Sequence, residues 1–385
     1  MIRVVLWDYI GGGLAWAKEF LKTDVEIIRT LRPNDADQAE VIMRGDWDYV
    51  LIFEKDTREI FDEVLNTIRA MNLSTENIIF AQEISEWVKN PVAIYSLIDF
   101  DKGAVFYRAL NFSNHKHWNY YATCTVEGLS YVATSKDEYV IESMYLGGKN
   151  HAADEMKTFH TLAKKYYNVD DSTGFFLDLG ANIGTTGIYF TKKIAPNLKL
   201  LAFEPDAENF KLLNANLILN DMINKSIAVN YGLGEDFEEK IMYRNLINPG
   251  GNGMFPYEKN MPTEKIEIIP LDAYFDEMQI APSEVKYIWI DTEGFEAQVL
   301  LGAKNLLREN PAPIFMEFNP MMWNKSGCFE IMIALLKSVG YSHWIYIPEF
   351  MKGKENLFPI DTLFDYKDST YWIGSIGDIF LVRSF

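Results

Sequence analysis

The residues best placed to do chemistry form a glycine-rich turn directly after an apolar segment. In Phe175-Phe-Leu-Asp-Leu-Gly-Ala-Asn-Ile-Gly-Thr-Thr-Gly187, Asp178 closes a predicted strand, and three glycines follow at the start of a predicted helix. Gly180 permits a sharp turn and leaves no Cβ where a ligand would approach, while Gly184 and Gly187 allow the helix to pack closely on a sheet. The amides at the helix start favour a polar or negative ligand group. The carboxylate of Asp178, in contrast, would oppose a pyrophosphate and suits a ligand that carries an ammonium group.

A second acid stands at the end of the next predicted strand. The segment Leu200-Leu-Ala-Phe-Glu-Pro-Asp206 contains Glu204, at a position where a carboxylate can accept hydrogen bonds from both hydroxyls of a ribose. An acid, a glycine turn and a second acid in this order predict a site for a nucleoside with a cationic amino-acid tail. The alternative interpretation is an ordinary strand–turn–helix with a capping acid. A dinucleotide fingerprint fits less well, because the glycine spacing is G-x3-G-x2-G rather than G-x-G-x2-G.

Further polar residues follow two later predicted strands. Asp291 ends one of them, and Glu317 and Asn319 end the next. Ligands of open α/β sheets bind at the carboxyl ends of the strands, so we expect these side chains around one site, with Asp291 in contact with the reacting centre. Glu293 is predicted either to bind the acceptor or act as a base, or to be a first-turn acid that stabilises a helix dipole. The three oxygen-bearing residues at the strand ends could also hold a divalent cation, but no metal ligand is assigned because solvated strand ends are the simpler interpretation.

Three of these motifs together resemble a known family. Asp178-Leu-Gly-Ala-Asn-Ile-Gly184, Phe203-Glu-Pro-Asp206 and Ile290-Asp-Thr-Glu-Gly-Phe-Glu296 are similar to the motifs of the FkbM family, which are S-adenosylmethionine-dependent methyltransferases of the Rossmann-like class. The similarity spans about Asp170 to the C-terminus. The resemblance implies that the first motif holds the methionine part of the cofactor, that the acid of the second holds its ribose, and that a segment after the third strand lines its adenine. On this sequence the implied cofactor-binding residues are Asp178, Gly180, Asn182, Gly184, Glu204, Asn230, Gly232 and Leu233; for the last three, a plain turn is the alternative.

The resemblance also implies a reaction. A methyl group would move from S-adenosylmethionine to a hydroxyl of a small molecule, sugar or glycan by in-line displacement, with Asp291 and Glu293 as the catalytic residues. Oxygen as the target follows from the resemblance alone, and nitrogen acceptors stay open. Two other classes are kept as alternatives: a nicotinamide-dependent oxidoreductase of Rossmann type and a non-catalytic cofactor-binding module.

The elements that must position these residues are short apolar runs with helical patterns between most of them. Runs of this kind suit strands that are buried on both faces of a parallel sheet. We predict an α/β fold with a seven-stranded sheet, of the Rossmann-like class I methyltransferase type by resemblance, over residues 141–385. A polar insertion at 235–270 is expected to pair as a hairpin. The predicted strands are Phe175–Leu179, Leu198–Phe203, Ser226–Tyr231, Tyr287–Ile290, Ile314–Phe318, His343–Ile347 and Ile379–Arg383.

The N-terminal part has a different pattern. Residues 1–92 alternate four apolar runs with four helical patterns, which predicts a small Rossmann-like α/β domain for docking, dimerisation or acceptor recognition. Residues 93–140 are predicted to form a β-rich connector that includes a strand at Tyr139–Glu142. The glycines that follow Trp7 could imitate a nucleotide-binding turn, but isolated glycine clusters are weak indicators.

Composition excludes several classes of protein. The 385 residues carry 36 Lys and Arg against 55 Asp and Glu, a net charge of −19, which argues against a nucleic-acid acceptor. Two cysteines cannot build a disulfide framework, a four-thiolate zinc site or an iron–sulfur cluster. No apolar stretch reaches the length of a membrane span, and the start lacks the pattern of a signal peptide, so a cytoplasmic enzyme is expected.

Overall fold

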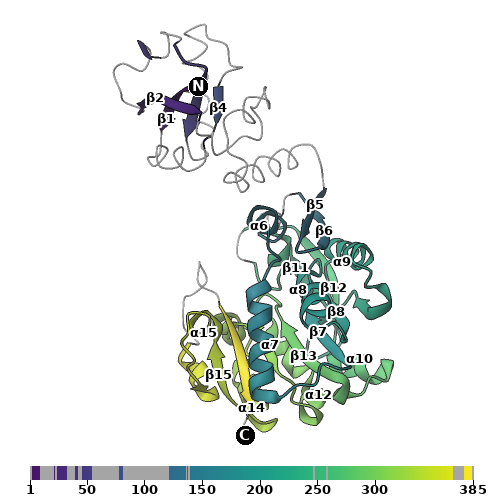
Figure 1. Ribbon diagram of the computed structural model, residues 1–385. Coiled ribbons are helices and arrows are strands. Elements are labelled where there is room, and N and C mark those ends of the chain that lie inside the picture. The colour runs from purple at the N-terminus through teal and green to yellow at the C-terminus, as the bar shows by residue number, and fades with distance from the viewer. Residues whose placement is uncertain are drawn as a thin grey trace. The chain divides into compact units, whose positions relative to one another are not determined.

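The computed structural model (Figure 1) describes residues 2–8, 21, 24–32, 40–41, 46–53, 78–80, 121–135, 137, 139–245, 248–256, 259–366 and 377–383. The chain divides into two compact units. The first comprises Met1–Ala122 with Tyr145–Gly147, and the second comprises Thr123–Met144 with Gly148–Phe385. No helix in the described ranges is both long and apolar enough to cross a membrane.

The first unit contains a four-stranded sheet in the order β2-β1-β3-β4, in which every neighbouring pair is parallel. Its strands are β1 (Ile2–Asp8), β2 (Val25–Leu31), β3 (Tyr49–Phe53) and β4 (Ile78–Phe80). They coincide with the four apolar runs that predict strands, Ile2–Trp7, Val25–Arg29, Tyr49–Phe53 and Asn77–Phe80. The four predicted helices, at 14–21, 37–43, 57–71 and 83–89, and the glycine cluster after Trp7 fall almost entirely outside the described residues. The role of this unit stays a prediction.

A hairpin and two helices begin the second unit. The hairpin is formed by β5 (Tyr121–Val126) and β6 (Leu129–Thr134), and α6 (Ile141–Gly147) and α7 (Ala153–Tyr167) follow it. The strand predicted at Tyr139–Glu142 is wrong, because Tyr139 and Val140 form a turn and α6 begins at Ile141. The carboxylate of Asp137 accepts the backbone N–H groups of Tyr139 and Val140 at 3.0 and 2.8 Å, which sets up the start of this helix.

The main sheet of the second unit has eight strands in the order β16-β15-β17-β14-β13-β7-β8-β9. The five strands from β14 to β9 are parallel, and β17, β15 and β16 pair antiparallel. The sequence predicts seven of them; it misses β16, a two-residue edge strand whose Phe358 lies opposite Trp344. The mixed α/β sheet is confirmed. The strands are β7 (Phe175–Leu179), β8 (Lys199–Phe203), β9 (Ser226–Val229), β13 (Val285–Ile290), β14 (Ile314–Glu317), β15 (Tyr341–Tyr346), β16 (Phe358–Pro359) and β17 (Asp378–Arg383).

The polar insertion forms a small second sheet in the order β10-β12-β11. The predicted hairpin is confirmed, since β11 (Glu238–Tyr243) and β12 (Thr263–Ile269) pair antiparallel. The two-residue strand β10 (Gly232–Leu233) adds to β12 in parallel, and this pairing joins the end of β9 to the insertion.

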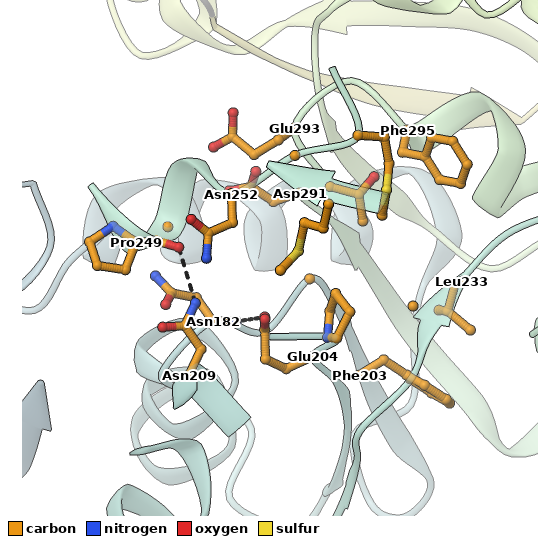
Figure 2. Close-up of a pocket in the computed structure, with 18 of the residues that line it drawn as sticks. Asn182, Phe203, Glu204, Asn209, Leu233, Pro249, Asn252, Asp291, Glu293 and Phe295 are labelled. Atoms are coloured by element: carbon orange, nitrogen blue, oxygen red, sulfur yellow. Dashed lines mark hydrogen bonds between the residues drawn. The ribbon is translucent and has the colours of Figure 1, made fainter. Parts of the chain in front are cut away.

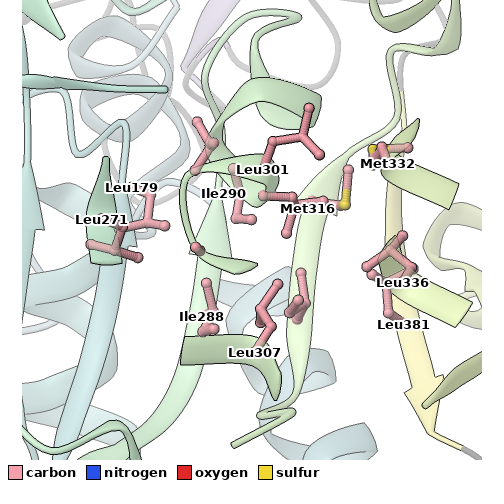
Figure 3. Close-up of a cluster of buried hydrophobic side chains, with 14 of the residues drawn as sticks. Leu179, Leu271, Ile288, Ile290, Leu301, Leu307, Met316, Met332, Leu336 and Leu381 are labelled. Carbon is pink, nitrogen blue, oxygen red and sulfur yellow. The ribbon is translucent and has the colours of Figure 1, made fainter. Parts of the chain in front are cut away.

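Helices cover both faces of the main sheet. On one face, apolar side chains of the strands pack in a single large core with those of the helices that follow β12, β13 and β14 (Figure 3). On the other face, Phe159 of α7 contacts the rings of Phe176, Phe190, Tyr287 and Phe315. The remaining α-helices are α8 (Thr185–Tyr189), α9 (Ala207–Leu219), α10 (Leu271–Met278), α11 (Glu296–Leu301), α12 (Lys304–Glu309), α13 (Pro320–Lys325), α14 (Phe329–Ser338) and α15 (Ile347–Phe350).

Short helical turns complete the second unit. A π-helical turn, Phe190–Ile194, continues α8, and 3-10 turns occupy Ile223–Lys225, Pro249–Gly251, Pro282–Glu284 and Ile360–Tyr366. Because β7, β8 and β13 are parallel neighbours, the residues that follow them meet at one edge of the sheet.

Candidate active site

A cleft lies at the carboxyl ends of β7, β8 and β13 (Figure 2). Its empty space amounts to about 570 Å³ when the space at its open mouth is included. Its walls come from the glycine turn after β7, the end of β8, strand β10, the 3-10 turn of the insertion and the loop after β13. Lining residues include Gly180, Asn182, Phe203, Glu204, Tyr231, Gly232, Leu233, Pro249, Asn252, Met254, Asp291, Glu293 and Phe295.

The glycine turn is held by backbone contacts to both neighbouring strands. The N–H groups of Gly180 and Ala181 donate to the carbonyl of Phe203 at 3.0 and 2.8 Å. Gly180 has a φ of +93°, and a Cβ at this position would lie 1.8 Å from the carbonyl oxygen of Asp291. A side chain is therefore excluded here both by the backbone conformation and by the close approach of the loop after β13.

Two of the predicted cofactor-binding residues lie behind the turn and are not part of the cleft lining. Asp178 is fully buried; its Oδ2 accepts the N–H of Gly187 at 2.9 Å, and its Oδ1 has no hydrogen-bond partner. Burial, together with the negative charge of Asp291, raises the pKa of Asp178 to about 7. Gly184 has a φ of +85° and packs against Leu213 of α9, where a Cβ would lie 2.5 Å from the leucine side chain.

Glu204 and Asn182 meet inside the cleft. Glu204 Oε2 accepts the backbone N–H of Asn182 at 2.7 Å (Figure 2). Its Oε1 accepts the backbone N–H of Asp206 at 2.9 Å. Each oxygen keeps a further lone pair that could accept from a ligand hydroxyl. Burial raises the pKa of the Glu204 carboxyl to about 8. The side-chain oxygen of Asn182 is buried without a partner, so both residues have unused acceptor capacity beside the glycine turn.

Of the three residues that the resemblance assigns to an adenine, two line the cleft and one does not. Gly232 and Leu233 line the cleft from β10. The exposed Asn230 does not line it; its side chain donates to the carbonyls of Glu204 and Pro205 at 2.8 and 3.1 Å. Asn230 therefore ties the ends of two strands together.

The loop after β13 brings two acids to the cleft. Asp291 is reached by solvent from the cleft but is densely surrounded by protein atoms, and this surrounding and the charge of Glu296 raise its pKa to about 7. Glu293 lines the same wall, and burial and the charge of Asp291 raise its pKa well above its ordinary value. Its interpretation as a first-turn helix acid is wrong, because Glu293 has a φ of +52° in the loop and α11 begins only at Glu296.

Glu296 was not singled out from the sequence, yet it organises this loop. It is completely buried. Its Oε1 accepts the N–H and the hydroxyl of Thr292, both at 3.0 Å, and the N–H of Gly294 at 3.1 Å, while its Oε2 accepts Nε1–H of Trp323 at 2.6 Å. Its position at the end of the third motif, Ile290–Glu296, is the feature of the sequence that could have pointed to it. Trp323 is fully buried beside Glu296 and is not among the cleft-lining residues.

Glu317 and Asn319 follow β14 next to this loop, and only 8% and 6% of their surfaces are exposed. They do not line the cleft. Within the described parts of the chain, no group of three His, Cys, Asp or Glu side chains could hold a metal ion.

The glycine-rich loop of the insertion lines the cleft through Pro249, Asn252 and Met254. Asn209 donates through Nδ2 to the carbonyl of Pro249 at 3.0 Å (Figure 2). Asn252 donates through Nδ2 to Oδ2 of Asp206, also at 3.0 Å. Arg244 Nε lies 3.0 Å from the same oxygen of Asp206. These contacts fix the loop to the beginning of α9, so this cleft wall is ordered.

Comparison with known proteins finds a family match within the second unit. Residues 178–342 match the family model of the methyltransferase FkbM domain, which confirms the resemblance seen in the sequence. The curated protein "Methyltransferase sdnD" of Sordaria araneosa is 37% identical over 91 residues, which are 23% of this chain and 34% of that protein. The match thus spans about a third of the length of this relative.

Two solved structures are also similar to this chain. One is a methyltransferase FkbM from Methylobacillus flagellatus KT, at 16% identity and a TM-score of 0.32, with 87% of this chain and 83% of that chain covered. The other is an S-adenosylmethionine-dependent O-methyltransferase from Thermotoga maritima, at 11% identity and a TM-score of 0.33, with 69% and 78% covered.

Proposed function

We propose that this protein transfers a methyl group from S-adenosylmethionine to a hydroxyl of a small molecule, sugar or glycan. The observation that carries the proposal is the cleft at the strand ends of a methyltransferase FkbM domain, which gathers Gly180, Glu204, Leu233 and Asp291 in one place. In open α/β sheets this edge is where ligands bind. The acceptor class rests on the family resemblance, and nitrogen acceptors remain the second choice.

The residues of the cleft fit the cofactor. The Gly180 turn leaves room for a ligand, and the unpartnered side-chain oxygen of Asn182 beside it suits the ammonium group of a methionine tail. Glu204 would accept hydrogen bonds from the ribose hydroxyls, and Gly232 and Leu233 would contact the adenine. When bound, the cofactor supplies a methyl group on a positively charged sulfur, which leaves as a neutral thioether.

The chain's own residues would align the acceptor and receive its proton. In the displacement, an acceptor oxygen forms the new bond to carbon, the carbon–sulfur bond breaks with its electron pair going to sulfur, and the hydroxyl proton leaves. We assign Asp291 as the carboxylate that receives this proton, because it faces the cleft and has a pKa of about 7, well matched to neutral pH. Glu293 is assigned to hydrogen bonding with the acceptor from the same wall.

Calorimetry and a turnover assay test the proposal. The full chain is expected to bind S-adenosylmethionine and S-adenosylhomocysteine and not NAD; the reverse would favour the oxidoreductase. Release of S-adenosylhomocysteine is then measured across a panel of sugars, glycans and metabolites. Asp291→Asn should reduce turnover by about 100-fold or more with little change in cofactor affinity. As the matched control, Glu330→Gln on the exposed face of α14 should leave turnover unchanged. Turnover retained by Asp291→Asn would refute the assignment of Asp291.

A further inference from the structure

Two asparagines, Asn216 of α9 and Asn220 at the end of this helix, bind the backbone of β6 through their side-chain amides. Oδ1 of Asn216 accepts the N–H of Val132 at 2.7 Å, and its Nδ2 donates to the carbonyl of Val132 at 3.1 Å. Asn220 holds Ser130 in the same way, at 3.0 and 2.7 Å. Among the described residues, β5 is the only strand that pairs with β6. The two amides therefore satisfy the edge of β6 where a further strand would otherwise pair.

The spacing of the two asparagines fits the spacing of the strand. Four residues of a helix advance by about 6 Å, and two residues of a strand by about 6.6 Å. Residues two apart in an antiparallel strand present their N–H and carbonyl groups to the same edge. Asparagines four apart in the helix can therefore hold residues two apart in β6. We call Asn216 and Asn220 the asparagine clamp.

Of the two residues of the asparagine clamp, Asn216 also binds the glycine turn of the cleft. Its Nδ2, which carries two N–H groups, donates to the carbonyl of Ile183 at 2.8 Å. Nδ2 of Asn220 instead donates to the carbonyl of Asn216 within the helical segment, also at 2.8 Å. Asn216 is completely buried, so solvent does not compete for its hydrogen bonds. This one side chain therefore joins the β5–β6 hairpin to the turn after β7.

Ile183 lies where the glycine turn shapes the cleft. The residue before it, Asn182, lines the cleft, and its N–H donates to Glu204 Oε2 at 2.7 Å. Asn182 has a φ of +50°, which is uncommon for residues other than glycine, so neighbouring contacts must hold the turn in this conformation. The residue after Ile183, Gly184, packs against Leu213 of α9. A shift of the Ile183 carbonyl would therefore move Asn182 and, through its N–H, Glu204.

We propose that Asn216 is a positioning residue of the cofactor site, and that it couples the glycine turn to the position of the β5–β6 hairpin. This inference rests on the proposed function for the identity of the ligand. The stretch Met1–Ala122 of the first unit ends within β5, so the hairpin is also a segment through which the chain enters the second unit. A change that moves β6 therefore changes the affinity of the cleft for S-adenosylmethionine, and the bound cofactor in turn stabilises the hairpin.

Two alanine variants of the asparagine clamp form a matched pair. Asn216→Ala and Asn220→Ala each remove two hydrogen bonds to β6, but the first also removes the bond to Ile183. Calorimetry on the full chain, well below the thermal midpoint of each variant, should show about tenfold weaker binding of S-adenosylhomocysteine for Asn216→Ala. For Asn220→Ala the change should stay below about twofold, because Asn216 still holds both β6 and the turn. A residue that only stabilises the fold shifts the midpoint and leaves this affinity unchanged, so equal affinities of the two variants would overturn the inference.

Hydrogen–deuterium exchange tests the same coupling from the side of the hairpin. Because coupling between two sites is reciprocal, saturation with S-adenosylhomocysteine should slow the exchange of the β6 amides in the wild type by about fivefold or more, relative to the amides of β15. This effect should disappear in Asn216→Ala and remain in Asn220→Ala. Exchange in β6 that does not respond to the ligand would refute the role of the hairpin, and this wild-type comparison decides alone if Asn216→Ala does not fold.

The unliganded variants separate this inference from the proposed function. If the wild type binds no S-adenosylhomocysteine, the proposed function fails. The amides of the turn from Gly180 to Gly187 should still exchange faster in unliganded Asn216→Ala than in unliganded Asn220→Ala, because the first variant alone has lost the bond to Ile183. Equal exchange of the turn in both variants would show that Asn216 does not position it.

Discussion

Replacing Asp178 by asparagine should make the protein more stable at neutral pH, because this carboxylate is buried at an energetic cost. The folded protein raises the pKa of Asp178 from 3.8 to about 7. The folded protein therefore binds this proton more tightly than the unfolded chain. Its stability falls as the pH rises from the pKa of the unfolded chain to the pKa of the folded protein. A difference of about 3 in pKa, at about 1.4 kcal/mol each, gives a loss of about 4 kcal/mol that is complete above pH 7.

The assay is chemical denaturation of the wild type and of Asp178→Asn between pH 5 and pH 8. The asparagine keeps an oxygen for the N–H of Gly187, so the main change is the removal of the ionisable group. Because the pKa of 7 lies about 2 above pH 5, the stability advantage of the variant should grow by about 3 kcal/mol across this range. Asp276→Asn, on the exposed part of α10, is the matched control and should run parallel to the wild type.

The same variant separates stability from function. If Asp178 contributes to holding the methionine tail, Asp178→Asn should bind S-adenosylmethionine about tenfold or more weakly despite its greater stability. Stability curves for variant and wild type that stay parallel from pH 5 to pH 8 would refute the argument, since burial would then not have raised the pKa of this group.

The remaining predictions concern the turn, the loop after β13 and the loop of the insertion. Gly180→Ala should destabilise the second unit by about 3 kcal/mol or more, measured by urea denaturation, because its Cβ would lie 1.8 Å from the carbonyl oxygen of Asp291; a change below about 1 kcal/mol would contradict this. Glu296→Ala should cost about 3 kcal/mol or more in the same assay, since it leaves several buried donors unpaired, whereas Trp323→Phe, which removes one of these bonds, should cost about 1–2 kcal/mol; equal costs would refute the central role of the glutamate. Asn252→Ala should speed the dissociation of S-adenosylhomocysteine by about threefold to tenfold in stopped-flow experiments, and an unchanged rate would show that this loop does not retain the cofactor.

Sequence patterns predict the strands of this protein well because most are continuous apolar runs. Each of the seven predicted strands of the main sheet is found within two residues of its predicted limits. The edge strand β16 was missed since two residues carry no periodicity. The segment Tyr139–Glu142 was misassigned because its aromatic and β-branched residues favour strands. In the structure the backbone N–H groups of Tyr139 and Val140 donate to the carboxylate of Asp137, which favours a turn into a helix.

The candidate site was predicted less completely. Motif positions in turns, such as Gly180 and Glu204, were found because their chemistry and spacing are local, and both line the cleft. The role of Glu296 depends on which hydrogen-bond donors surround it in three dimensions, and linear spacing does not contain that information. Asn230 was placed on the cleft by resemblance, but its side chain turns to the strand ends instead.

The contact between Gly180 and the carbonyl of Asp291 also constrains how this protein can change. Because the turn after β7 and the loop after β13 touch through their backbones, neither can be exchanged without the other. A chimera that takes the turn after β7 from a relative should therefore also take the loop after β13 from the same relative. The turn after β7 and the loop after β13 are thus expected to be inherited together.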